Sequence, residues 1–225
     1  IVGEPTGLAV ATGHKGKTAL RARFSGREGH SALAPLALNA LHLAAEFVQA
    51  VRAAQAEIAE GGARDGDYDV PYTTLHVGTL SGGSALNIVP NRAEAAFEIR
   101  ALAEDDPQAI LARLRAEAEA IAARAEDADA AIEIETEFAY PGLATPTDAE
   151  VVSFVKRLTG ANATIKVAYG TEGGLFAERL GLPVVVCGPG SMAQGHKADE
   201  FVTEEQIARC DAMLDALIDR LEAGA

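Results

Sequence analysis

Residues 72–102 read YTTLHVGTLSGGSALNIVPNRAEAAFEIRAL, and this stretch carries the strongest indication of the fold. Its first part, 72–83, is rich in β-branched residues, and its last part, 93–102, alternates apolar and polar residues. Both patterns are typical of β-strands. The stretch therefore predicts two consecutive strands joined by the connection ALNIVPNR.

The flanking sequence completes a recognisable element order. Residues 18–25 alternate as a half-buried strand does, and 37–57 place apolar residues at helical spacing. On the other side, Asp106 and Pro107 are an N-cap followed by proline at the first helical position, which predicts a helix to about residue 124. A further alternating strand is expected at 131–138.

The predicted order β-α-β-β-α-β is that of a ferredoxin-like sandwich, and it occupies 18–137. Helices and strands alternate after it, which is typical of an α/β domain with a mostly parallel sheet. These later elements are helix 148–159, strand 163–168, helix 172–180, strand 183–187 and helix 204–222. We therefore expect an α/β protein in which 1–17 and 138–225 form a partial α/β domain and 18–137 is an inserted module.

Composition limits the classes of partner. Asp and Glu outnumber Lys and Arg by 33 to 19, so nucleic acid and anionic membranes are not expected as partners. No apolar run reaches membrane-spanning length, which favours a globular protein in water. The two cysteines, Cys187 and Cys210, are far apart in sequence and are expected to be reduced, which fits the cytoplasm.

Two strand-end loops carry candidate metal ligands. Glu4 lies in IVGEPTGL, where an apolar pair runs into Gly3 and a carboxylate, and His196 lies in CGPGSMAQGHKADEF at 187–201. Carboxylate and imidazole both bind divalent metals, and sites in α/β sheets gather at strand ends. On local sequence alone, a backbone-capping carboxylate and a surface histidine explain the two residues as well.

Three residues of the inserted module are candidates for substrate contact. His30 lies in the loop GREGHSALAP, where a flexible, exposed imidazole could donate a hydrogen bond to a substrate oxygen. Asn87 and Arg100 are expected on adjacent strands, and Arg100 would bind a carboxylate well. A surface role for His30 and a structural salt bridge for Arg100 remain open.

The segment GTEGG at 170–174 precedes a helix, so its amides and Thr171 could hold an anionic group. Glu204 and Glu205 resemble a catalytic acid pair, but Thr203 and Gln206 form a capping box that explains acids in that first helical turn. His14, His42 and His76 form no constellation, and the HKG run at 14–16 is at most a hinge contact.

Taken in order, GEPTGL, GHKG, GHSALAP, NIVPN, YGTEGGLF and GPGSMAQGHKADEF resemble the aminoacylase/carboxypeptidase family of di-zinc amidohydrolases. The resemblance runs over essentially the whole chain and is strongest to the acetylornithine-hydrolysing branch. It implies zinc as cofactor, two ions per complete subunit with cobalt as an alternative, an N-acyl amino acid substrate, and a homodimer through the inserted lid domain.

The same resemblance implies roles for individual residues. Glu4 and His196 match metal ligands, and His30 matches the lid histidine that stabilises the oxyanion in the partner subunit's site. Asn87 and Arg100 match substrate-contacting lid residues, and Gly170, Thr171 and Gly173 fall in a matching substrate-binding loop.

The family's His-x-Asp motif and Glu-Glu pair have no counterpart in this sequence, so only two of five expected ligands are present. The resemblance therefore implies the later portion of such an enzyme, expected to be inactive or nearly so alone. Two alternatives stay open: a succinyl-diaminopimelate desuccinylase or carboxypeptidase of the same family, or a non-catalytic module for dimerisation or small-molecule binding.

Overall fold

The computed structural model describes residues 1–195 and 197–224. It divides into two compact units. The terminal unit holds Ile1–Gly16, Asp65–Pro71 and Tyr140–Ala225, and the insert unit holds Lys17–Arg64 and Tyr72–Ala139.

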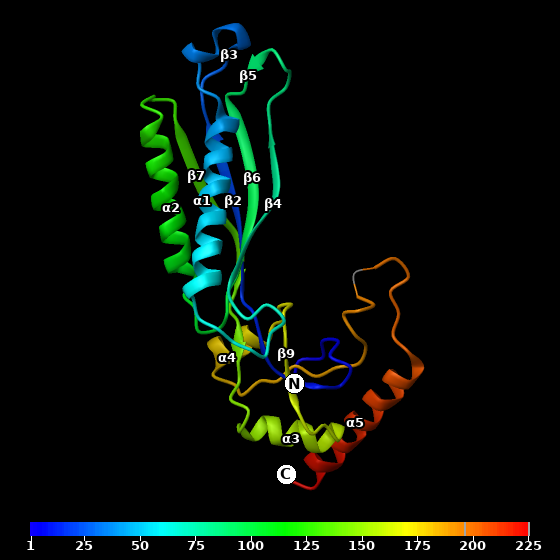
Figure 1. The fold of residues 1–225 in the computed structure, drawn as a ribbon. Coiled ribbons are helices and arrows are strands. Elements are labelled where there is room, and N and C mark those ends of the chain that lie inside the picture. Colours follow the sequence, from blue (N-terminus) through cyan, green and yellow to red (C-terminus); the bar gives the residue numbers. More distant parts are fainter. Residues whose placement is uncertain (196, 225) are drawn as a thin grey trace. The chain divides into compact units, whose positions relative to one another are not determined.

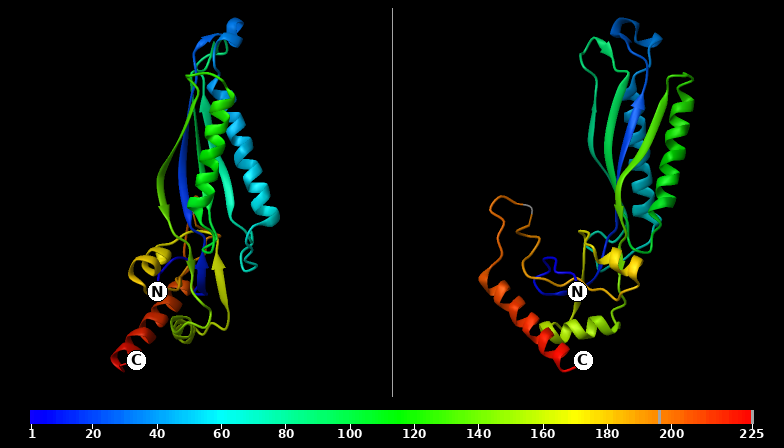
Figure 2. Two further views of the ribbon diagram at one scale, coloured as in Figure 1. Left: turned by 90° about the vertical axis from the view of Figure 1, so that its left-hand side faces the viewer. Right: turned by 180° about the vertical axis from the view of Figure 1, so that it is seen from behind.

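The insert unit is a four-stranded sheet with two long helices on one face (Figures 1 and 2). The strand order β4-β6-β2-β7 is that of a ferredoxin-like sandwich, and β6 pairs antiparallel with both β2 and β4. Its elements in chain order are β2 (Lys17–Ser25), β3 (Gly29–His30), the 3₁₀ helix η1 (Ser31–Leu36), α1 (Ala40–Gly61), β4 (Thr74–Gly82), β5 (Ile88–Val89), β6 (Arg92–Arg100), α2 (Pro107–Arg124) and β7 (Ala131–Tyr140).

Alternation along β6 explains this layering. Its odd-numbered residues from Ala93 to Ile99 are buried toward the helices, and its even-numbered residues face the open side. Phe47 of α1 is fully buried between Phe24 and Phe97, with ring centroids 5.7 and 5.5 Å away. One continuous hydrophobic core therefore joins the sheet to its helices.

Helix ends follow the local sequence. Asp106 accepts a hydrogen bond from Gln108 N at 2.8 Å with Pro107 next to it, which confirms the predicted start of α2. The helix expected from residue 37 begins at Ala40 instead, because the Asn39 side chain caps it through Leu41 N. The short pair β3–β5 was not expected, since two-residue strands leave no periodic signal.

The terminal unit contains a three-stranded sheet of order β8-β1-β9, in which β1 pairs parallel with β9 and antiparallel with β8. The sheet is thus mixed rather than mostly parallel. Its elements are β1 (Val10–His14), β8 (Leu143–Ala144), α3 (Glu150–Thr159), β9 (Thr164–Val167), α4 (Gly173–Leu180) and α5 (Glu204–Glu222).

In this unit the sequence analysis missed one strand and predicted one that does not form. The strand β1 was missed, and no regular strand forms at 183–187. Val186 makes one isolated β-bridge to Val2 and one to Ala11. Neither neighbouring segment pairs with 183–187 over several consecutive residues, so no regular ladder forms. The stretch is nevertheless buried, as its apolar sequence requires.

The expected boundaries also need one correction. Residues Asp65–Pro71 were assigned to the inserted module but cluster with the terminal unit. Two lysines hold them there: Lys15 Nζ donates to the Val70 carbonyl at 2.8 Å, and Lys166 is ion-paired with Asp65. Across residues 1–195 and 197–224, no helix combines the length and apolar character needed to cross a membrane.

Candidate functional site

One end of the insert unit brings two predicted site residues together. The short strands β3 and β5 lie side by side at this end (Figure 1). His30 lies opposite Ile88 in this pair, and the neighbouring Ser31 N donates to the Asn87 carbonyl at 2.9 Å. Both His30 and Asn87 are exposed. Although 57 positions apart, they form one exposed pair on two joined loops.

The local geometry assigns the tautomer of His30. Its Nδ1 accepts a hydrogen bond from Ala32 N at 3.2 Å and so caps η1. Because a backbone amide can only donate, the neutral ring carries its proton on Nε2. The Nε2–H group on the other edge of the ring is therefore a hydrogen-bond donor, as an oxyanion contact requires.

Arg100 lies elsewhere in this unit. It ends β6 opposite Thr74, whereas β6 begins near His30's end of the sheet, where Ser25 pairs with Arg92. The nine residues of β6 are separated by eight rises of about 3.3 Å, so its two ends lie roughly 26 Å apart. The structure therefore does not bring Arg100 together with His30 and Asn87 inside one insert unit.

The guanidinium of Arg100 is engaged by a carboxylate of its own strand. Its Nε and a terminal nitrogen donate to the two oxygens of Glu98 at 2.9 and 3.3 Å, and Lys17 pairs with the same carboxylate at 3.2 Å. Burial opposes ionisation of Glu98, but the bonds from Arg100 and Lys17 outweigh it and lower its pKa. The salt-bridge interpretation of Arg100 thus has a definite partner.

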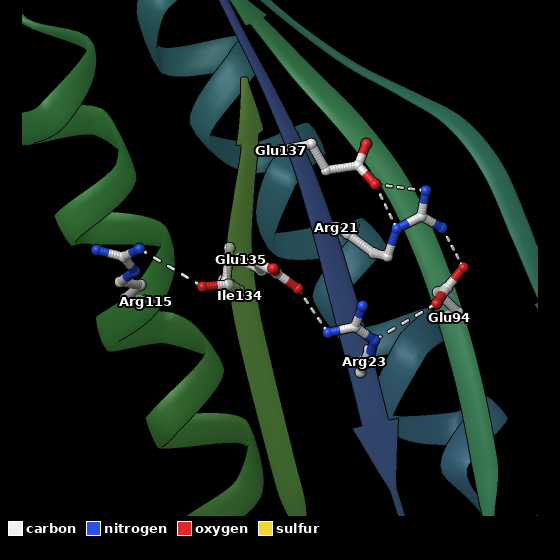
Figure 3. A network of polar contacts seen from close by, with 7 residues as sticks. All are labelled: Arg21, Arg23, Glu94, Arg115, Ile134, Glu135 and Glu137. Atoms are coloured by element: carbon white, nitrogen blue, oxygen red, sulfur yellow. Dashed lines mark hydrogen bonds and ion pairs between the residues drawn. The ribbon is translucent and has the colours of Figure 1, made fainter. Parts of the chain in front are cut away.

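The open face of the sheet carries a network of ion pairs that the sequence analysis did not single out (Figure 3). Arg21 bridges Glu94 and Glu137, and Arg23 bridges Glu94 at 3.7 Å and Glu135 at 2.7 Å. The signal was present as charged residues at alternate positions of three strands. Such exposed pairs each contribute little to stability, so the network makes this face polar rather than strongly stabilising it.

In the terminal unit, the two predicted strand-end loops meet. Thr6 N and Leu8 N both donate to the Gly188 carbonyl, at 3.2 and 2.9 Å, and Gly7 N donates to the Gly190 carbonyl at 2.7 Å. Leu8 has φ of 64°, a strained value for a bulky residue, and its side chain is buried. The loop bearing Glu4 is thus held against the loop after Cys187.

The segment 170–174 also reaches this loop. Tyr169 donates its hydroxyl proton to the Pro5 carbonyl at 2.8 Å, next to Glu4. Burial raises the pKa of Tyr169, and the charge of Glu4 raises it further. Thr171 is buried and accepts from Gly173 N at 2.9 Å, so this amide already has a partner within the protein.

The described residues do not by themselves complete a metal site. Glu4 lies in the described loop, whereas His196 lies outside the described residues. Within the part of the chain that the structure describes, no three His, Cys, Asp or Glu side chains gather closely enough to hold a metal ion. Cys187 is no substitute, because burial raises the pKa of its thiol to about 11 and keeps it protonated.

The acid pair at 204–205 has the structural role expected for it. Thr203 accepts from Gln206 N at 3.2 Å at the start of α5, and both acids lie in the first turn. This confirms Thr203 as the N-cap, but the reciprocal half of the predicted capping box does not form, because Gln206 Oε1 accepts from Gly190 N at 3.3 Å instead. Cys187 and Cys210 are both free, in agreement with the expectation of reduced cysteines.

Solved structures define the class of fold. Aminopeptidase PepT from Bacillus cereus superposes with a TM-score of 0.71 at 18% identity, over 95% of this chain and 54% of that one. A tripeptidase from Staphylococcus aureus gives 0.67 at 20% identity, over 95% and 53%. At these identities the likeness establishes the fold alone: a mixed α/β fold with an inserted ferredoxin-like unit.

The family follows from the sequence comparison. Residues 12–126 match the family model described as the peptidase dimerisation domain, and this chain belongs to that family. The match spans most of the insert unit together with the end of β1 and Asp65–Pro71 of the terminal unit.

Particular relatives agree with one branch of the resemblance. An acetylornithine deacetylase of Myxococcus xanthus is 33% identical over 217 residues, 95% of this chain and 55% of the relative. One from Pasteurella multocida is 31% identical over 226 residues, 100% and 57%. The chain thus spans just over half the length of the curated relatives it matches.

Proposed function

We propose that this chain takes part in the hydrolysis of N²-acetyl-L-ornithine to L-ornithine and acetate, a step of arginine biosynthesis in the cytoplasm. The observation that carries the proposal is the similarity to acetylornithine deacetylases over nearly the entire chain. The order of motifs from GEPTGL to GPGSMAQGHKADEF supports it.

In this proposal the insert unit supplies substrate contacts. His30 donates its Nε2 proton to the oxyanion that develops at the amide carbon, in the partner subunit's site, and Asn87 contacts the substrate beside it. Arg100 binds a substrate carboxylate by exchanging its pairing with Glu98. In the terminal unit, Gly170, Thr171 and Gly173 position the substrate.

Zinc is the proposed cofactor, with cobalt as an alternative, and it would supply an activated water. Glu4 and His196 are proposed ligands from this chain, and the remaining ligands and the general base have to come from outside the described residues. The lack of a three-ligand cluster among the described residues also favours a second candidate function, a module that binds a small molecule or dimerises without catalysis.

The proposed assembly is a homodimer through the insert unit. The two edge strands of its sheet, β4 and β7, differ in how well they could pair with a second copy. The edge strand β7 carries Glu133, Glu135 and Glu137, which discourage edge-to-edge association. The other edge, β4, carries His76 as its one ionisable side chain and exposes Leu80. We therefore assign the dimer contact to β4 and the adjacent helix α1.

A groove beside β4 supports this assignment. It has a volume of about 390 Å³. Residues of α1 and β4 line it, five of them apolar, and the other three are Arg52, Gln55 and His76. The side-chain amide of Gln55 is only half satisfied. Its Oε1 accepts from Leu75 N, but its buried Nε2 has no acceptor among the described residues. A movement of the Gln55 side chain would bring this amide within reach of a carbonyl of a second copy.

Matched substitutions on the two edges test the assembly. Leu80→Lys should shift the protein toward monomer in sedimentation equilibrium, whereas Phe138→Lys on β7, equally exposed, should leave the dimer intact. The reverse pattern would assign the contact to β7.

Zinc content and turnover test the function itself. The protein is dialysed against trace zinc and its metal content per chain is measured. The same sample is assayed on N²-acetylornithine, on N-succinyl-diaminopimelate and on peptides with a free C-terminus, which are carboxypeptidase substrates. We expect little zinc and little turnover by this chain alone, and His30→Ala should lower acetylornithine turnover about 10²–10³-fold in a complete dimer. Preference for another substrate would move the proposal to that branch of the family.

A further inference from the structure

His14 makes two backbone contacts from a fully buried position at the end of β1. Its Nδ1 lies 3.0 Å from the Lys15 carbonyl oxygen, and its Nε2 accepts a hydrogen bond from Gly174 N at 3.2 Å. A carbonyl can only accept and an amide can only donate. The ring is therefore neutral, with its proton on Nδ1 and a bare Nε2 facing Gly174.

Protonation is incompatible with the second contact, because it would point an N–H of the ring at the N–H of Gly174. Burial lowers the pKa of His14, while the Lys15 carbonyl and the charge of Glu172 act in the opposite direction. The charged groups around it are Glu172 before α4, Lys15 next in the chain and Lys166 on the neighbouring strand β9. The neutral ring is the form that keeps the bond to Gly174.

Gly174 has little freedom to move away from this acceptor. A Cβ atom at this position would collide with the backbone carbonyls of Pro141 and Gly142, so the chain is packed directly against them. At the other end of the segment, Tyr169 is bonded to Pro5, and the ring of Tyr140 lies against Gly170. The segment 169–174 is thus fixed at both ends, and His14 forms the contact at its helical end.

We propose that His14 is a positioning residue, which holds the segment 170–174 in its binding geometry through the Gly174 amide. It is not expected to touch substrate. The part of this proposal that concerns substrate rests on the proposed function of 170–174; the part that concerns the segment's conformation does not.

Two amide substitutions separate the contacts of the ring. In His14→Gln the side-chain oxygen reaches the place of Nε2 and can accept from Gly174, whereas in His14→Asn the side chain reaches only the Lys15 carbonyl. We expect the hydrogen-exchange protection of the Gly174 amide, measured by NMR, to fall about tenfold or more in His14→Asn and to stay within about threefold in His14→Gln. His42→Asn, at an exposed position of α1, is the matched control.

Equal Gly174 protection in the Asn and Gln variants would overturn the proposal. Should His14→Asn fail to fold by circular dichroism, the unaltered protein still decides: the protection factor of the Gly174 amide, which corrects for the pH dependence of intrinsic exchange, must fall as the His14 ring becomes protonated. The same fall is expected in Glu172→Gln. A Gly174 protection factor that stays constant while the His14 ring is protonated would refute the role of His14.

Binding of N²-acetylornithine is followed in the same spectra. We expect shifts at 170–174 and affinity about tenfold weaker in His14→Asn than in His14→Gln. An absence of shifts in the unaltered protein would count against the proposed substrate contact, while the exchange comparison would still decide the role of His14.

Discussion

The two units of this molecule stabilise their interiors differently. The insert unit has one large core in which three phenylalanine rings join the sheet to α1. The terminal unit has two smaller clusters, one around Val152 and Met213 and one around Ala11 and Val186. Most of the large apolar side chains exposed in the described chain also belong to the terminal unit.

The difference indicates where function can depend on fixed geometry. A single well-packed core tolerates exposed loops at its end, such as those of His30 and Asn87, because the core does not depend on them. In the terminal unit, the loops of Glu4 and 170–174 are held mainly by hydrogen bonds to backbone groups. Loss of one such bond should alter the loop more than the unit.

Phe47→Ala should give the largest effect. The ring is fully buried between two other rings, so its removal should cost the insert unit about 3–5 kcal/mol in free energy of unfolding. Chemical denaturation followed by probes in each unit measures this. Phe138→Ala, at 50% exposure in the same unit, is the control and should cost less than about 1 kcal/mol.

Val152→Ala should cost the terminal unit about 2 kcal/mol, because two buried methyl groups are removed from a smaller cluster. If the units unfold independently, this substitution shifts one transition and Phe47→Ala shifts the other. A common shift of both transitions would show that the two cores unfold as one, and the comparison drawn above would be wrong.

The sequence predicted the insert unit well because its strands alternate and its helices carry caps, as at Asp106. It missed β1 because all five of its residues are buried, so VATGH shows no alternation. The strand predicted at 183–187 failed for a related reason: apolar sequence reports burial, but a ladder also needs a neighbouring run.

The site was predictable to a similar degree. Glycine-flanked His30 and the two strand-end loops were recognisable, and the structure joins those loops through Thr6 and Gly188. The roles of their side chains stay predictions. His14 was set aside because a contact with Gly174, 160 positions away, leaves no local pattern. The pairing of Arg100 with Glu98 was within reach of the sequence, because residues two positions apart on the predicted strand 93–102 share a face.

Acidification should distinguish the units by a smaller effect. The pKa of His14 is lowered from the value of 6.5 that we take for the unfolded chain, so the unfolded state binds more protons as the pH falls. The contribution of His14 to stability is intact above about pH 6.5 and declines below it. The terminal unit should therefore lose stability first, and His14→Gln should flatten this part of its stability–pH curve.

The smallest effect is expected on the open face of the insert unit (Figure 3). Arg23 is 51% exposed and Glu135 60% exposed, so water and salt screen their 2.7 Å pair. A double-mutant cycle of Arg23→Ala and Glu135→Ala should give a coupling energy of about 0.2–1 kcal/mol that falls as salt is added. Coupling well above this range and insensitive to salt would mean that the face is covered in solution, which would make the ion-pair network part of an interface rather than a solvated surface.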